Sequence, residues 1–170
     1  MSAKPSFFAE LTPVLARPQV DLEGFGPFMR GDLGVAQLRL GRTAEARATF
    51  AQLIRDLGPG AADRVDDALE PMLLALGYAG TGQPRQAVEQ ARHAVELYRD
   101  DHIWDWRVTE ALAKVQAWTG ERDGAIATLQ TVLAMHPANL PAAMKLDPMW
   151  DPLRDDPRFD RLLADSEAKP

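Results

Sequence analysis

The chain has 170 residues and contains no cysteine, so it has no disulfide, no thiolate nucleophile and no cysteine-based zinc site. It has no apolar run near the roughly 18 residues of a membrane-spanning helix, and its start, Met-Ser-Ala-Lys-Pro-Ser, lacks a signal-peptide core. The net charge of −6 disfavours non-specific binding of nucleic acid, which needs a basic surface. We therefore expect a soluble, cytoplasmic protein that contacts neither nucleic acid nor a membrane.

Residues for common catalytic chemistry are scarce. The three serines stand near the two ends of the chain, which argues against a Ser-His-Asp triad. The three histidines include no i, i+4 pair, so we interpret them as solvated or helix-end residues and not as metal ligands. The acidic pairs Asp66-Asp67, Asp100-Asp101 and Asp155-Asp156 fall at expected helix starts or loops, where carboxylates cap helices.

The glycine-rich stretch 77–82 has the composition of a phosphate loop. It follows an expected helix and not a strand, and no Gly-Lys-Ser/Thr follows it, so we interpret it as a turn between helices. The sequence therefore predicts no enzyme, no metal site and no cofactor.

The chain does contain one pattern that occurs three times. Measured from Gly41, Gly82 and Gly120, small or apolar residues stand at positions −8, −7, +5, +9 and +12 each time. The three sets are Leu33, Gly34, Ala46, Phe50 and Leu53; Leu74, Ala75, Ala87, Ala91 and Ala94; and Leu112, Ala113, Ala125, Leu129 and Val132. Three copies with identical offsets are typical of a helical repeat array.

This pattern resembles the tetratricopeptide repeat (TPR), whose first helix carries a Leu-Gly step and whose second helix carries Ala-xxx-Phe-xx-Ala before a proline. The resemblance covers residues 28–137. It implies an all-α, right-handed superhelix of about three antiparallel helix pairs, with capping helices at the ends. Repeats of this family hold other proteins or peptides, so the resemblance implies binding rather than catalysis.

The helical periodicity predicts how the chain is divided. We expect three irregular repeats within residues 25–138, and the first helices at about 28–40, 68–79 and 105–119. Thr43 is the expected N-cap and Gly58 the expected stop of one second helix. The full set of expected segments is an N-terminal cap at 1–24, repeats at 28–60, 68–101 and 106–138, a C-terminal cap at 139–165 and a tail at 166–170.

The repeats are not evenly spaced. Their glycines lie 41 and then 38 residues apart, against about 34 in the standard repeat, so we expect insertions near 59–67 and 100–105. The Trp104-Asp105-Trp106 cluster lies at the second insertion, and it is either part of the core or an exposed binding site.

The end of the chain carries three Asp-Pro steps, Asp147-Pro148, Asp151-Pro152 and Asp156-Pro157. Each step can supply an N-cap and a first-turn proline, so we expect short helices or turns with sharp corners. The apolar face expected to cover the last repeat consists of Trp150, Leu153, Phe159, Leu162 and Leu163. This ending also resembles the C-terminal tail of repeat regions in bacterial kinase, cyclase and winged-helix signalling proteins.

The TPR resemblance implies a binding surface, because the first helix of each repeat lines the concave face in that family. An apolar centre at Met72 and Leu76 suits a peptide with apolar anchors, with a cationic edge beside it. Alternatively, the chain's own Phe7-Phe8 segment fills the groove. The implied partner-binding residues are Arg39, Leu69, Met72, Leu76, Arg107, Glu110, Lys114 and Trp118.

These observations predict a protein–protein interaction module that binds a peptide or a partner protein. The resemblance of the C-terminal tail suggests the recruiting or sensing part of a bacterial signalling protein. The alternative is structural self-association, in which two copies pair as a homodimer and no separate ligand exists.

Overall fold

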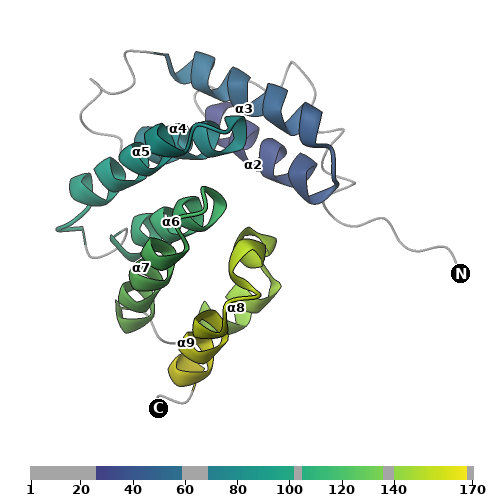
Figure 1. The fold of residues 1–170 in the computed structure, drawn as a ribbon. Coiled ribbons are helices and arrows are strands. Elements are labelled where there is room, and N and C mark those ends of the chain that lie inside the picture. The colour runs from purple at the N-terminus through teal and green to yellow at the C-terminus, as the bar shows by residue number, and fades with distance from the viewer. Residues whose placement is uncertain (1–25, 59–68, 102–104, 136–139, 168–170) are drawn as a thin grey trace, which may run out of the picture. The chain divides into compact units, whose positions relative to one another are not determined.

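The computed structural model describes residues 26–58, 69–101, 105–135 and 140–167. These residues form α-helices and one 3₁₀ helix, and no strand occurs among them, so the expected all-α fold is confirmed. The chain divides into two compact units, Met1–Gln83 and Pro84–Pro170 (Figure 1). We call them the N-terminal unit and the C-terminal unit and describe each by itself.

In its described part, the N-terminal unit consists of three packed helices. Helices α2 and α3 form an antiparallel pair joined by a short turn, and α4 packs against both (Figure 1). The helices are α2 (Gly26–Arg39), α3 (Thr43–Leu57) and α4 (Leu69–Thr81). The bounds of α2 and α4 differ by at most two residues from those expected from the periodicity.

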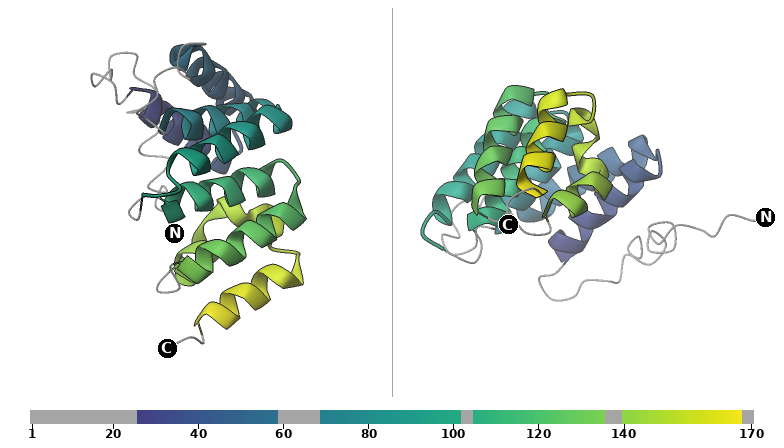
Figure 2. Two further views of the ribbon diagram at one scale, coloured as in Figure 1. Left: turned by 90° about the vertical axis from the view of Figure 1, so that its left-hand side faces the viewer. Right: turned by 90° about the horizontal axis from the view of Figure 1, so that it is seen from below.

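The C-terminal unit is built around a second antiparallel pair, α6 and α7. Helix α5 and the 3₁₀ helix η2 pack against α6, and α9 packs against both α7 and α8 (Figure 2). The elements are α5 (Pro84–Leu97), α6 (Asp105–Trp118), α7 (Arg122–Met135), α8 (Leu140–Leu146), η2 (Pro148–Leu153) and α9 (Pro157–Glu167). A right-handed superhelix made by both units together stays a prediction.

The repeat glycines end α2, α4 and α6 in the same way. Gly41, Gly82 and Gly120 have φ angles of 71°, 79° and 85°, in the left-handed region where side chains cause strain. Each glycine N–H donates to the carbonyl three residues earlier, and the next N–H donates to the carbonyl five residues earlier, at 2.8–3.3 Å. This is the Schellman ending, and it reverses the chain within two or three residues.

The residues counted from these glycines make up the core. Every residue of the three sets is buried, and the alanines at +5, namely Ala46, Ala87 and Ala125, are fully buried. The common offsets therefore correspond to equivalent buried positions in the three copies.

In the N-terminal unit, the ring of Phe50 on α3 lies in a slot between two glycines of neighbouring helices. A Cβ added at Gly34 on α2 would lie 2.5 Å from the ring, and one added at Gly80 on α4 would lie 2.0 Å from it. Nearby, Ile54 lies over Gly77 in the same manner, with 2.8 Å to an added Cβ. All three distances are shorter than van der Waals contact, so these positions need glycine for packing.

A buried hydrogen bond is repeated in two of the copies. Thr49 donates to the side-chain oxygen of Gln37 at 2.7 Å, and Thr128 donates to that of Gln116 at 2.7 Å. Counted from the repeat glycine, both glutamines lie at position −4 and both threonines at position +8. Both glutamines are buried. The sequence template omitted these positions, because polar residues do not contribute to a hydrophobic period. The corresponding residues of the second copy are Tyr78 and Gln90.

The C-terminal segment packs onto the α6–α7 pair as expected for a cap. Trp150, Leu153, Phe159 and Leu163 are almost completely buried in one cluster with residues of α6 and α7, and Leu162 packs against it. The rings of Trp150 and Phe159 stack with their centroids 5.9 Å apart. These side chains cover apolar surface of the last repeat that would otherwise face solvent.

Two of the three Asp-Pro steps start helices. Asp147 accepts from the backbone N–H of Met149 at 2.9 Å, and Asp156 accepts from that of Arg158 at 3.0 Å. The expectation for the third step is wrong, because Asp151-Pro152 lies inside η2. A 3₁₀ helix is short and its hydrogen bonds have poorer geometry than those of an α-helix, so the donor that an internal proline lacks costs less there.

The expected caps of α3 are half correct. Gly58 ends the helix with a φ of 64°, as expected, and its N–H bonds to Ile54 at 3.1 Å. Thr43 is not the N-cap but the first helical residue, because the turn at Gly41 leaves room for Arg42 alone. The N-terminal segment with Phe7-Phe8 and most of the two expected insertions lie outside the described residues.

A cluster of charges fixes the start of α9 to the start of α7. Arg158 binds Asp156 at 2.7 Å and Asp123 at 2.8 Å, and Arg122 binds Asp155 at 2.6 Å. The side-chain and backbone hydrogen bonds that Arg158 donates to Asp156 lower the pKa of that carboxyl to about 2, from the usual 3.8.

We expect Asp156→Asn to lower stability at pH 7 and to make stability less dependent on acid pH. Because the folded-state pKa of Asp156 is lowered, its contribution is present above the usual pKa of 3.8 and is lost as the pH falls toward about 2. Urea unfolding at a series of pH values should therefore show that the wild type has the larger free energy of unfolding at pH 7, and that its difference from the variant shrinks as the pH falls over this range. Asp160→Asn on the same helix is the control, and an equal effect there would contradict the prediction.

We expect Gly80→Ala to destabilise the protein by about 1–3 kcal/mol, because the new Cβ would overlap the Phe50 ring. Helix propensity alone would predict that the substitution stabilises the protein, since alanine favours the helical state over glycine by about 1 kcal/mol. Denaturant unfolding of Gly80→Ala decides between them. The loss should be smaller in a Phe50→Leu background, and an equal loss would mean that the ring is not the cause.

Candidate functional site

Four of the predicted partner-binding residues lie in the N-terminal unit. Leu69, Met72 and Leu76 are half-buried residues of α4, and Arg39 is the half-buried last residue of α2. The tip of Leu76 lies 3.2 Å from the position of a Cβ on Gly31, so this side chain lies against α2. The structure thus brings the apolar residues to the α2 side of α4.

The other four lie on α6 in the C-terminal unit, at spacings of three and four residues that place them on one face. Arg107 is exposed and stacks on the ring of Trp106, with 5.0 Å from its guanidinium carbon to the ring centroid. Glu110, Lys114 and Trp118 are half-buried. A single groove that joins the faces of the two units stays a prediction.

Lys114 is bound by two carboxylates of its own chain. Its ammonium lies 3.0 Å from Glu110, one turn earlier on α6, and 3.0 Å from Asp147, the N-cap residue of η2. It also lies 5.7 Å from the centroid of the Trp150 ring. Burial alone would lower the pKa of Lys114, but the charges and hydrogen bonds of the two carboxylates outweigh burial and raise it.

The electrostatics of Lys114 and Arg39, two of the three predicted cationic positions, differ as a result. At Lys114 the positive charge is already balanced, and the residue ties the C-terminal segment to α6. At Arg39 the charge acts on Asp32, whose pKa is raised by partial burial and lowered in part by that arginine.

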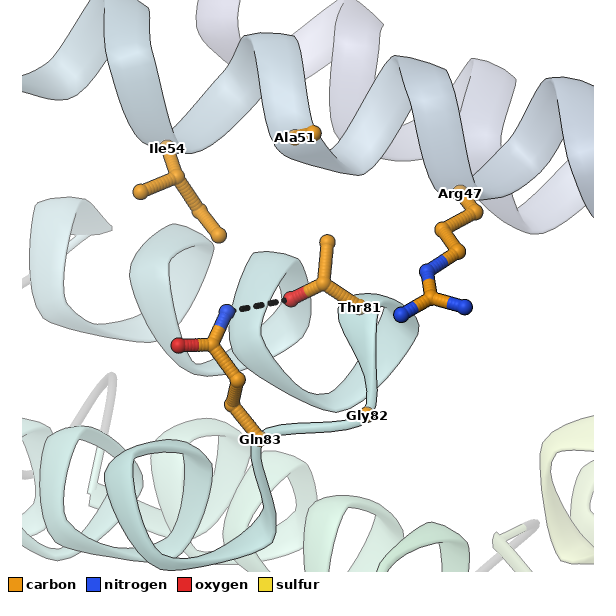
Figure 3. Close-up of a pocket in the computed structure, with 6 residues that line it drawn as sticks. All are labelled: Arg47, Ala51, Ile54, Thr81, Gly82 and Gln83. Carbon is orange, nitrogen blue, oxygen red and sulfur yellow. Dashed lines mark hydrogen bonds between the residues drawn. The ribbon is translucent and has the colours of Figure 1, made fainter.

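A hollow of about 530 Å³ lies elsewhere in the N-terminal unit, between α3 and the turn after α4 (Figure 3). Arg47 reaches into it from one end of α3, and Ile54 lines the opposite end (Figure 3). Across from α3, Gln83 donates a hydrogen bond to the Thr81 hydroxyl at 2.8 Å. No pattern in the sequence predicts this hollow, because its lining residues come from segments about 30 positions apart.

The described part of the chain holds no group of three or more histidine, aspartate or glutamate side chains arranged to bind a metal ion. His93 is the one histidine among the described residues, and Asp100-Asp101 follows the end of α5. No helix in the described ranges is long and apolar enough to cross a membrane.

Comparison with known families bears on the first helix pair. Residues 32–56, which span most of α2, its glycine turn and nearly all of α3, match the profile described as Tetratricopeptide repeat. This segment of the chain is similar to a tetratricopeptide repeat. The comparisons with curated proteins and with solved structures found no match.

The similarity to a TPR accounts for the rest of the described fold. The second and third copies carry the same glycine turn and the same buried offsets as the copy that matches the profile. TPR arrays are protein–protein interaction modules, and the match therefore supports a protein–protein interaction module in general.

We expect Lys114→Ala to destabilise the C-terminal unit by about 1–2 kcal/mol, less than the 3–5 kcal/mol typical of a fully buried pair, because its side chain is 23% exposed. Thermal unfolding followed by circular dichroism would measure the effect. Lys145→Ala, which removes a more exposed ion pair with Glu167, should cost less. Equal costs for the two variants would contradict a special role of Lys114.

Proposed function

We propose that this protein binds a peptide segment of a partner protein on the α2–α4 face of its N-terminal unit. The observation that carries the proposal is the partial exposure of Leu69, Met72 and Leu76 on one helix, whose neighbours Leu73 and Leu74 are buried. Apolar side chains that remain accessible on an ordered helix provide anchor contacts for a partner.

Apolar anchors in such grooves commonly contribute about 2 kcal/mol or more each, while exposed charge pairs contribute about 0–1 kcal/mol. Met72 and Leu76 therefore carry most of the proposed binding energy. Arg39, and Arg107 in the C-terminal unit, act as weaker positions that favour a negatively charged segment. Glu110, Lys114 and Trp118 form a separate candidate face on α6 of the C-terminal unit, where Lys114 acts mainly through its contact with the C-terminal segment.

The proposal extends to the cellular role. The resemblance of the C-terminal tail to the tails of bacterial signalling proteins supports a recruiting or sensing role in the cytoplasm. The net charge of −6 supports a protein partner over a nucleic acid.

Self-association as a homodimer is the second candidate, and it is favoured by a different observation. Three large apolar side chains are exposed among the described residues: Phe28, Leu97 and Met135, at 42–44%. Such side chains are common at contacts between copies. Sedimentation that gives the mass of a monomer at every concentration would exclude this candidate.

The α2–α4 face can be tested with a displayed library of random peptides selected on the wild-type protein. We expect the selected peptides to share an apolar anchor and to bind Met72→Glu about tenfold or more weakly, because the carboxylate would be placed in the apolar contact. Fluorescence anisotropy of labelled peptides measures the affinities.

Ala48→Glu, an exposed position on α3, is the matched control, since it adds the same charge away from the proposed face. Circular dichroism should show both variants folded. If Met72→Glu binds the selected peptides as tightly as the wild type does, the proposed face is not the binding site.

A further inference from the structure

We infer that the hollow between α3 and the turn after α4 is a second contact site, which takes an acidic side chain next to an apolar one in an extended peptide. Its volume, about 530 Å³, falls within the range of about 300–1,000 Å³ found for ligand sites. It lies between α3 and α4, whereas Leu76 of the proposed binding face lies against α2. The two sites are therefore independent.

The hollow has a charged end and an apolar end. Arg47, Ala51 and Ile54 follow one another at spacings of four and three residues, so they share one face of α3 (Figure 3). The guanidinium of Arg47 extends toward the turn at Gly82, and Ile54 and Ala51 provide an aliphatic wall (Figure 3). A ligand that fills the hollow would therefore place a negative group and an aliphatic group side by side.

Arg47 is available for such a ligand. It is exposed, and its guanidinium takes part in none of the ion pairs or hydrogen bonds of the described residues. Other arginines of the unit are engaged, as Arg30 is with Asp56 at 2.6 Å. A planar guanidinium pairs well with a carboxylate, because both can form two parallel hydrogen bonds.

The negative end of the α4 dipole faces the hollow and would by itself oppose an anion. Three carbonyls near its end, however, already accept hydrogen bonds. The Thr81 hydroxyl donates to Gly77, the N–H of Gly82 donates to Ala79, and the N–H of Gln83 donates to Tyr78. Arg47 carries a full positive charge, against roughly half a negative charge at a helix C-terminus, so Arg47 determines the sign of the ligand.

The probe that tests this inference is the capped dipeptide N-acetyl-Leu-Glu-amide, titrated into isotope-labelled full-length protein and followed by NMR. We expect saturable shifts of the backbone signals of Thr81, Gly82 and Gln83, with a Kd on the order of 1 mM. N-acetyl-Leu-Gln-amide, which has the same shape without the charge, should bind about tenfold more weakly. N-acetyl-Ser-Glu-amide should also bind more weakly, because it lacks the aliphatic group.

Arg47→Gln should remove the preference for glutamate over glutamine, whereas Arg55→Gln, the same change at another exposed residue of α3, should leave it intact. Met72→Glu should not affect dipeptide binding. The two experiments are therefore separate: if the α2–α4 face turns out not to bind peptides, the inference about the hollow still stands. The inference is overturned if the glutamine dipeptide binds equally well, if the shifts occur elsewhere, or if both arginine variants behave alike.

Discussion

The left-handed turn at the repeat glycine is the constraint on which the described structure depends. Because Gly41, Gly82 and Gly120 all adopt positive φ and close the same two hydrogen bonds, each first helix ends in the same geometry. In the two repeats that lie within one unit, the turn also fixes which residues of the second helix face the first. The hydrogen bond between positions −4 and +8, at 2.7 Å in both, shows how closely the register is kept. A residue with a Cβ at the glycine would strain the turn and alter the pairing of both helices.

Within that register, the copies fill the core with different volumes. At positions −7 and +9 the first copy has glycine and phenylalanine, the second has two alanines, and the third has alanine and leucine. A large side chain at one position is thus matched by a small one at the other, which keeps the packing dense without overlap. The first copy also requires Gly80 on α4, so its ring links three helices and not two.

Much of the fold could be predicted, because its signals are local. Apolar periodicity and the glycine turns predicted α2, α4 and α6 to within two residues, and the Asp-Pro steps indicated the short helices of the C-terminal segment. Contacts between distant residues were not predictable in the same way. The ring of Phe50 packs against Gly80, and Lys114 forms an ion pair with Asp147. No periodic pattern in the sequence predicts either contact. The family resemblance indicated which helices carry the candidate site residues. It could not indicate that the charge of Lys114 is balanced by Glu110 and Asp147.

The C-terminal segment has a consequence for the size of assemblies that the chain can form. A repeat array exposes complementary surfaces at its two ends, so copies that stack end to end can grow without limit. Here the apolar surface beyond α6 and α7 is filled by Trp150, Phe159 and Leu163 of the same chain. The outward side of α9 presents charged residues instead, among them Asp160 and Arg161. The segment thus removes this apolar surface as a site at which a second copy could stack end to end.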